Sequence, residues 1–423
     1  MTSRTLRLLR SGIWQPFAAM SLALLSSLAA ATDFSLDRSL HLDANHDDNL
    51  LLREQPLSSL GQTANARMGF GAASEQTSAD VEVELWARRF NRSDFNSDDQ
   101  RVRANFSHTF ELSSIGLRLD ALRDSTLTSE PLDSGRIEDA QRHEQYSASP
   151  NWSYQLGEQD LLSLQGSYVS SYYRGQGYSD YRYWQAQLLW THSITERLRG
   201  FVAVNYSDYQ SQPRLYAFSQ SYATGSTERG LQIGGDYQFS ENIVASILAG
   251  SSANETEAQV EDPLQYCPFA EAFDLLPLFP LCTLQDSDSS LTTVNASLKW
   301  SNPRHELTAD ISHNTQPSSN GFVQEVAQLD LNWRYRVWEY GTLGLALIAG
   351  AADVSGEQAT GTSQPSRDYQ YATLSYSHAL NESWFIDCNY RYRSQQYENR
   401  DQVTSDAAFV GITWKPKSQH WSR

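Results

Sequence analysis

The chain has 423 residues, a formal net charge of −18, 12% aromatic residues and only three cysteines. Its mean hydropathy of −0.53 excludes a polytopic helical membrane protein, because each helical span needs roughly 20 consecutive apolar residues. The negative charge argues against nucleic acid as a partner, since neutralisation of phosphates by cationic side chains supplies most of the affinity of such binders.

The N-terminal segment, residues 1–31, has the pattern of a secretory signal peptide. Arg4, Arg7 and Arg10 form a cationic start, residues 17–28 are mostly apolar, and Ala29 to Ala31 form a small-residue cleavage site. A signal anchor is the alternative, but the apolar stretch is short and is interrupted by serines. We therefore expect export and cleavage near Ala31.

Two segments that follow the signal peptide show the alternation of β-strands. They are residues 35–45 and 61–74, and residues 46–60 join them as an outer loop. With sixteen strands predicted farther along the chain, this pair makes eighteen. The evidence for the pair is weaker, so sixteen strands with a periplasmic N-terminal segment stays as the alternative.

The acidic stretch around this first loop matches a calcium-binding loop in part. Asp48 stands where the sharp turn of such a loop requires glycine, and no flanking helices are predicted. The favoured interpretation is a solvated acidic loop, with calcium as a minor alternative and no metal otherwise expected. The candidate calcium ligands are Asp43, Asn45, Asp47, Asn49 and Glu54.

Residues 79–414 repeat segments of about ten to fifteen residues in which apolar and polar side chains alternate, a period of two that is typical of strands. The segment 102–112 is an example, with apolar residues at most even positions. The segment 326–337 shows the same alternation with one slip near Gln328. Pro150 lies inside another such segment and predicts a bulge or an interruption, because proline cannot donate a hydrogen bond to the ladder.

The connections between these segments alternate between short and long. This sorting is typical of an outer-membrane barrel with short periplasmic turns and long extracellular loops, whereas a soluble sandwich gives no reason for it. We predict short turns at 113–114, 156–159, 195–196, 240–241, 302–303, 339–340 and 381–382, and long loops near 91–100, 124–139, 174–179, 210–226, 255–287, 316–323, 355–365 and 398–403.

The predicted fold is therefore an all-β, transmembrane, antiparallel, up-and-down β-barrel over residues 32–414. An open sheet edge in hydrocarbon would leave unpaired amides at several kcal/mol each, so the sheet must close. Aromatic residues near strand ends are expected to form the two interfacial girdles. The candidate girdle residues are Tyr172, Tyr173, Trp184, Trp190, Trp300, Trp333, Trp338, Trp384 and Trp414.

The inward face of these strands carries charges of both signs. In a barrel of this size the interior holds water, and opposed rows of charge would create a transverse field that selects polar solutes. The alternative is that the charges pair with each other and fill the interior. The candidate pore-lining residues are Glu82, Glu84, Arg101, Arg103, Arg118, Asp120, Arg197, Arg199, Asp236, Asp310, Asp330, Arg334, Arg336, Asp387, Arg391 and Arg393.

The longest loop, residues 253–287, is apolar and rich in proline, and it contains Cys267 and Cys282. In an oxidising compartment these two cysteines can pair, and a bridge over about 15 residues would stabilise the loop by about 3 kcal/mol. We predict that this loop is a constriction or a lid, with a surface cap as the alternative. Cys388 is predicted to face lipid as a small apolar residue.

Several hairpins repeat a tight turn that carries glutamate, as in YQLGEQDLLSLQGSYVSSYY from residue 154, HSITERLRGFVAVNYSDYQ from residue 192 and YQFSENIVASILAG from residue 237. The chain resembles the outer-membrane β-barrel proteins associated with exopolysaccharide and exosortase (PEP-CTERM) gene systems. HDDNLLL at residue 46 is similar to the Asp-Asn element after that family's first strand, which supports eighteen strands. The resemblance implies a link to surface polysaccharide and supplies no catalytic residues.

The end of the chain departs from the usual pattern of barrels, whose last strand ends on an aromatic residue that the assembly machinery reads. Here the alternation ends at Trp414 and KPKSQHWSR follows. We therefore expect an internal assembly signal, and we interpret residues 415–423 as a short C-terminal periplasmic tail.

The function predicted from the sequence is a passive, porin-like or export channel for hydrophilic solutes in the bacterial outer membrane, with a link to exopolysaccharide export. The first alternative is an occluded structural or adhesive barrel that presents its outer loops to a matrix or to partners. An outer-membrane lipid or glycan hydrolase ranks lowest, since no histidine is seen to face a serine and an acid on neighbouring strands. The expected partners are outer-membrane lipid, the barrel-assembly machinery and polysaccharide or envelope biosynthesis proteins, and no cofactor is expected.

Overall fold

The computed structural model describes residues 33–422 except 136, 138–139, 176, 213, 216–220, 262–271, 273–286 and 355–365. The predicted signal peptide and the predicted Cys267–Cys282 disulfide lie outside the described residues. Within the described ranges, no helix is long and apolar enough to cross a membrane.

One antiparallel sheet of twenty strands contains almost all of the regular structure in the described residues, and eighteen of its strands are long. The long strands are β1 (Asp33–Asp47), β2 (Ser59–Ala73), β3 (Thr77–Phe90), β4 (Ser97–Thr109), β5 (Ser113–Ser125), β6 (Arg142–Gln155), β7 (Asp160–Arg174), β8 (Tyr181–Ser193), β9 (Leu198–Ser211), β11 (Ser221–Ser240), β12 (Ile243–Glu261), β13 (Ser287–Ser301), β14 (His305–Pro317), β15 (Val323–Trp338), β16 (Gly341–Val354), β17 (Arg367–Ala379), β18 (Trp384–Tyr397) and β19 (Val403–Trp414). The short elements are β10 (Arg214–Leu215), β20 (Gln419–Ser422), η2 (Ser93–Phe95) and α2 (Thr126–Ser129).

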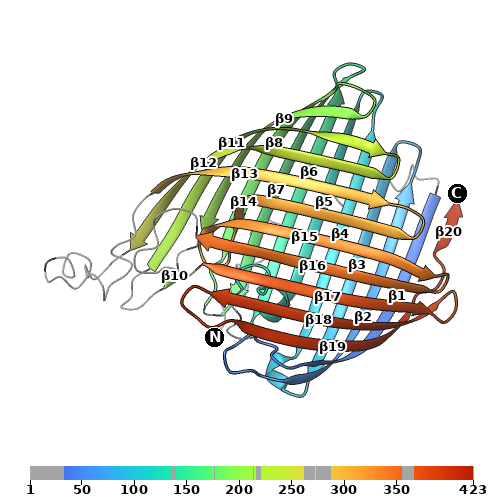
Figure 1. Cartoon of the computed structure of the whole chain (residues 1–423), viewed down its shortest axis with the longest axis vertical. Helices are drawn as coiled ribbons and strands as arrows, with labels where there is room; N and C mark the ends of the chain where they lie inside the picture. Colours follow the sequence, from blue (N-terminus) through green and yellow to red (C-terminus); the bar gives the residue numbers. More distant parts are fainter. Residues whose placement is uncertain are drawn as a thin grey trace, which may run out of the picture.

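Each long strand pairs with the next one along the chain, and the pairing of β1 with β19 closes the sheet into a barrel (Figure 1). In this seam Leu40 lies opposite Trp414 and Asp47 lies opposite Ala407. The predicted eighteen-stranded, antiparallel, up-and-down barrel is confirmed. The predicted upstream pair forms β1 and β2, so the sixteen-stranded alternative is wrong.

The short and long connections lie at opposite ends of the strands, as predicted. Two positions differ from the prediction. The turn predicted at 113–114 lies at residues 110–112, where the Phe110 amide donates to the Ser113 carbonyl at 2.7 Å. The strands β11 and β12 extend into the predicted loops and cover residues 221–226 and 255–261. A period of two fixes which face a residue is on, but it does not fix where a strand ends.

The two irregularities predicted from the sequence take other forms. Strand β6 is continuous and keeps one register with β7 on both sides of Pro150, so there is no bulge, but the ladder with β7 is interrupted at residues 149 and 150. Gly166 stands opposite this proline in that register. A Cβ atom at Gly166 would lie 3.1 Å from Pro150 Cγ, so the glycine leaves space for the ring. Strand β15 is regular around Gln328, and its register shift lies between Arg336 and Trp338. Val326 is therefore an inward-facing apolar residue, not a slip.

The outward face of the barrel is an apolar surface. Its side chains alternate with the inward charges. Many of them are large and exposed, and Ile233, for example, has 69% of its surface exposed. Trp300, His305, Trp333 and Tyr335 stack near the short-turn end of β13 to β15, with the His305 and Tyr335 ring centroids 4.5 Å apart. Cys388 is exposed and lies opposite Tyr376, on the face predicted for it.

The end of the chain forms a further strand. β20 pairs with residues 33–36 of β1, beyond the point where β19 ends, and the Trp421 ring stacks on Phe34 with centroids 5.7 Å apart (Figure 1). The predicted tail thus completes the short-turn half of the seam. Because the sheet is closed here by two strands in succession, the edge of β1 is covered along most of its length.

Candidate functional site: the mouth of the barrel

The buried apolar clusters in the described part of the chain lie at the long-loop end of the barrel, where connections fold inward. We call the described residues of segments 48–58, 126–141, 175–180 and 318–322 the mouth plug. These segments contact the inner wall and one another.

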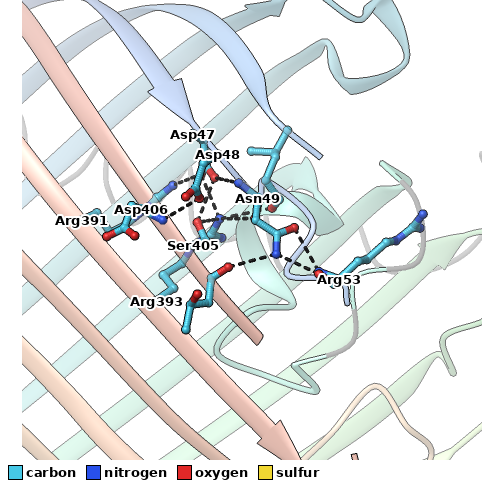
Figure 2. Close-up of polar contacts among 10 residues, drawn as sticks. Asp47, Asp48, Asn49, Arg53, Arg391, Arg393, Ser405 and Asp406 are labelled. Atoms are coloured by element: carbon cyan, nitrogen blue, oxygen red, sulfur yellow. Dashed lines mark hydrogen bonds and ion pairs between the residues drawn. The ribbon is translucent and has the colours of Figure 1, made fainter. Parts of the chain in front are cut away.

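Asp47 anchors the first segment of the mouth plug, and it is 1% exposed. Its carboxylate accepts from the guanidinium groups of Arg393 at 2.9 Å and Arg391 at 3.1 Å, from Ser405 Oγ at 2.8 Å and from the Asn49 amide at 3.0 Å. Figure 2 shows these side chains converging from β1, β18 and β19. The segment that follows Asp47 is therefore fixed to the wall.

The predicted solvated acidic loop is wrong for Asp47, because this carboxylate is buried and paired with two arginines. Asp43 accepts from Asn45 Nδ2 at 3.1 Å, so two further candidate calcium ligands contact each other. Among the described residues, no group of three His, Cys, Asp or Glu side chains is arranged to hold a metal ion.

The next residues of this segment press against the inner wall of β15 to β18. Arg393 donates to the Leu50 carbonyl at 3.2 Å, and Gln395 donates to the Leu52 carbonyl at 3.3 Å. Leu52 packs in an apolar cluster with Val326 and Tyr369. Its φ of 47° is in the left-handed region, which costs a non-glycine residue roughly 1–2 kcal/mol. Packing and hydrogen bonds hold Leu52 in this conformation.

The second segment, residues 126–141, crosses from β5 and β6 to β17 on another part of the wall. Arg367 donates to the Pro131 and Asp133 carbonyls, each at 3.0 Å, and Tyr371 Oη donates to the Pro131 carbonyl at 2.6 Å. At its base, Ser125 caps α2 by accepting from the Leu127 amide. Strands far apart in the barrel are thus bridged through the lumen.

Glu130 is the polar centre of this segment and is 0% exposed. Its carboxylate accepts from Ser134 Oγ at 2.5 Å and from Ser319 Oγ at 2.7 Å. Burial raises the pKa of Glu130, and burial together with the neighbouring Glu130 charge raises the pKa of Asp133 well above its usual range. Simultaneous ionisation of these two neighbouring carboxyl groups is therefore unfavourable.

The fourth segment, residues 318–322, joins the plug to the opposite wall. Tyr209 Oη on β9 donates to the Ser318 carbonyl at 3.0 Å, and Thr224 Oγ1 on β11 donates to the Gly321 carbonyl. The Ser179 amide, in the third segment, donates to the Ser319 carbonyl at 2.7 Å. Hydrogen bonds consequently connect the second, third and fourth segments, and the first segment packs against the second in the apolar cluster of Leu50, Leu51 and Ile137.

A chain of three side chains lies beneath the second segment. Asp124 Oδ1 lies 2.8 Å from His143 Nδ1, and His143 Nε2 lies 2.8 Å from Ser171 Oγ, on β5, β6 and β7. The expectation that no histidine faces a serine and an acid on neighbouring strands is wrong. Tyr173, predicted for the girdle, is buried and stacks on His143 at 4.6 Å. The alternation within a single strand does not reveal the register between strands, so it cannot show that residues of three different strands lie side by side.

A cavity of about 290 Å³ lies between the second segment and the wall. The segment contributes Ser129, Leu132 and Asp133 to its lining. The wall residues are Leu122, His143, Gln145, Gln316, Pro317, Gln324, Val326, Arg367 and Tyr369.

The predicted pore-lining charges mostly form ion pairs between neighbouring strands. Arg101 lies 2.7 Å from Asp120, and Arg103 lies 3.0 Å from Glu82. In the same way Arg103 lies near Glu84, Arg199 pairs with Asp236, and Arg334 pairs with Glu306. Arg391 and Arg393 on β18 pair with Asp47 across the intervening strand β19.

The remaining predicted charges have other environments. Arg118 donates to Asn105 at 3.1 Å, and Asp387 accepts from Thr413 at 2.6 Å. Asp310 stands opposite Asp330 in the ladder. Arg197 lies in the exposed turn before β9, and Arg336 lies beside the register shift near the end of β15. These contacts favour the interpretation that charges pair and fill much of the wall.

The predicted lid, residues 253–287, lies mostly outside the described residues, apart from its ends in β12 and β13. The segments that fold into the mouth were not predicted from the sequence. The signal that points to them is a group of apolar or aromatic residues on the inward face at the long-loop ends of strands, such as Val326, Tyr369, Tyr371 and Tyr181.

No protein-family model and no curated protein sequence matches the chain. Solved structures with a similar arrangement include the ferric citrate transporter FecA in its unliganded form, with 9% identity, a TM-score of 0.44 and coverage of 90% of this chain and 79% of that chain. The outer membrane channel DcaP of Acinetobacter baumannii has 12% identity, a TM-score of 0.43 and coverage of 92% and 98%. OccAB4 of the same organism has 10% identity, a TM-score of 0.42 and coverage of 91% and 99%. Likeness at this level carries no argument about function.

Proposed function

We propose that this protein is a bacterial outer-membrane channel for hydrophilic solutes, and that the mouth plug closes it at the long-loop end. The closed sheet satisfies the backbone of the strands, as hydrocarbon requires, and the outward side chains are apolar. The inward face carries charges and amides. Together, these features support a barrel with lipid outside and water within.

The gating part of the proposal is based on the hydrogen bonds that hold the second segment, residues 126–141, against the barrel wall. Arg367 and Tyr371 bind carbonyl groups of residues 131 and 133, and two serines bind Glu130. These are side-chain contacts, not a continuous backbone ladder. A neutral hydrogen bond contributes about 0.5–1.5 kcal/mol, and one from a charged group such as Arg367 contributes about 1.5–3 kcal/mol. Such a segment can leave the lumen without disturbing the barrel wall.

The test is conductance in planar lipid bilayers. We expect the full-length protein to remain mostly closed, and a variant in which residues 128–138 are replaced by a short Gly-Ser linker to give steady ohmic steps. Heat-modified migration on a gel checks that both proteins fold as barrels. A folded linker variant that is as silent as the wild type would contradict the channel.

That silent outcome would support the second candidate, an occluded structural or adhesive barrel. The specific observation in its favour is the extent of burial in the mouth plug, where Asp47 and Glu130 are almost inaccessible to solvent. The link to exopolysaccharide export is part of our proposal, and its support is the resemblance of the hairpin motifs. Export with cleavage near Ala31 is also proposed, and the mass of the purified mature chain tests it.

The proposal does not include catalysis. Asp124, His143 and Ser171 have the order and spacing of a hydrolytic triad, but Ser171 is 0% exposed, and in this arrangement the three groups serve as a hydrogen-bonded brace. We expect no labelling by a fluorophosphonate probe in the folded protein. Labelling that disappears in Ser171→Ala would instead favour the hydrolase.

A further inference from the structure

The cavity beneath residues 126–141 has two walls of different origin. Ser129, Leu132 and Asp133 belong to the mouth plug, whereas Gln145, Gln324 and the other lining residues belong to the barrel. Its volume of about 290 Å³ is at the lower end of the range of roughly 300–1,000 Å³ for small-molecule sites. A solute of about one sugar ring fits such a space and would touch plug and wall together.

The polar groups of this cavity are mostly uncharged. Gln145, Gln316 and Gln324 each present a carboxamide, which can donate and accept hydrogen bonds at once. Ser129 Oγ is buried and has no hydrogen-bond partner within the described part of the chain. Hydroxyl groups, which also donate and accept, complement this set better than an ion does.

The charged groups at the cavity balance one another. Arg367 contributes one positive charge, and it is held by the carbonyls of Pro131 and Asp133. Asp133 lines the cavity, the nearby Glu130 is buried, and burial raises the pKa of both carboxyl groups. Since two adjacent carboxyl groups do not both ionise readily, one negative charge near Arg367 leaves the region near neutrality. His143 also lines the cavity, and Asp124 and Ser171 already engage both of its nitrogens.

The rest of the lining is apolar and partly aromatic. Leu122, Leu132, Pro317, Val326 and Tyr369 provide surfaces for the C–H faces of a ring. Sites that combine apolar surface with a few convergent polar groups are typical of small-molecule binding.

We propose that this cavity binds a neutral, polyhydroxylated solute of monosaccharide size, held between the carboxamides of the wall and Ser129 of the mouth plug. The inference deepens the proposed function, because it names the class of solute that the closed mouth recognises. A bound solute that bridges plug and wall stabilises the closed arrangement, since a ligand favours the state that it binds more tightly.

The test uses the full-length protein in a detergent without sugar headgroups, with D-glucose as the probe in saturation-transfer difference NMR. We expect glucose to bind and glucuronate to bind at least tenfold more weakly. Gln145→Leu combined with Gln324→Leu is expected to weaken glucose binding about tenfold or more. The matched control is Gln370→Leu, an exposed glutamine on the outward face of β17, which should leave binding unchanged.

A second variant keeps the test decisive if the double variant fails to fold. Ser129→Ala removes a hydroxyl that has no described partner, and we expect it to fold normally and weaken glucose binding about threefold. Absence of glucose binding by the wild type, equal binding of glucuronate, or unchanged binding in Ser129→Ala would overturn the site. Binding does not depend on conductance, so a protein that binds glucose but never conducts refutes the channel alone, and one that conducts without binding glucose refutes the site alone.

Discussion

Replacing Asp47 with alanine is expected to release residues 48–58 from the wall and to lower the free energy of unfolding by about 3–5 kcal/mol. The reason is that Arg393, whose side chain is 6% exposed, loses its carboxylate partner. Removal of one member of a buried ion pair leaves an uncompensated charge, and this costs more than the pair contributes. The measurement is urea-induced unfolding in lipid vesicles, followed by tryptophan fluorescence, together with conductance of the same variant.

The neighbouring Asp48→Ala is the matched control. Asp48 is exposed and accepts from the Asp406 amide at 2.8 Å, so its loss should cost about 1 kcal/mol or less. We expect Asp47→Ala to show more frequent channel openings than Asp48→Ala. If the two variants unfold at the same urea concentration and conduct equally, Asp47 does not anchor the plug.

Leu331→Arg is expected to destabilise the barrel by about 2–4 kcal/mol, the cost of a cation on the lipid face at the middle of the membrane. Leu331 lies near the middle of β15, opposite Ala309 and Leu347 and on the same face as Trp333. Asn332 lies on the other face, between Thr308 and Ala346, and Asn332→Arg should be tolerated and should alter only ion selectivity. Urea titration in vesicles compares the two variants, and equal damage from both would contradict the assigned faces.

The strands and their faces could be predicted because the alternation of apolar and polar residues is visible within each strand alone. In β15, Leu329, Leu331 and Trp333 alternate with Asp330 and Asn332, and a closed sheet is the physical consequence of that pattern in lipid. The first hairpin was also predicted, although the evidence for it was weaker, and the HDDNLLL element at residue 46 supported it.

The mouth plug could not be predicted in the same way, because its contacts join residues far apart in the sequence. Nothing near Glu130 in the sequence indicates Ser319, and the partners of Asp47 lie on β18 and β19. The sequence contains one indication of the plug. Val326 is an apolar residue on the otherwise polar inward face of its strand, and the sequence interpretation treated it as a slip of register. Its apolar side chain instead contacts Leu52 of the plug.

The ion pairs among the inward charges also could not be predicted from the pattern of single strands. Alternation predicts that Arg101 and Asp120 share a face, but only the register of β4 with β5 brings them together at 2.7 Å. The Asp124, His143 and Ser171 brace depends on three registers at once. The strand β20 was missed because four residues are too few to show a period.

The central claim is that neighbouring side chains of one strand face hydrocarbon and water in turn. Single cysteines at positions 328 to 333, in a background with the three native cysteines changed to serine, test it in lipid vesicles with a membrane-impermeant maleimide applied to both sides. We predict that positions 328, 330 and 332 react and that positions 329, 331 and 333 are protected. Uniform labelling, or labelling of the odd positions instead, would contradict the account.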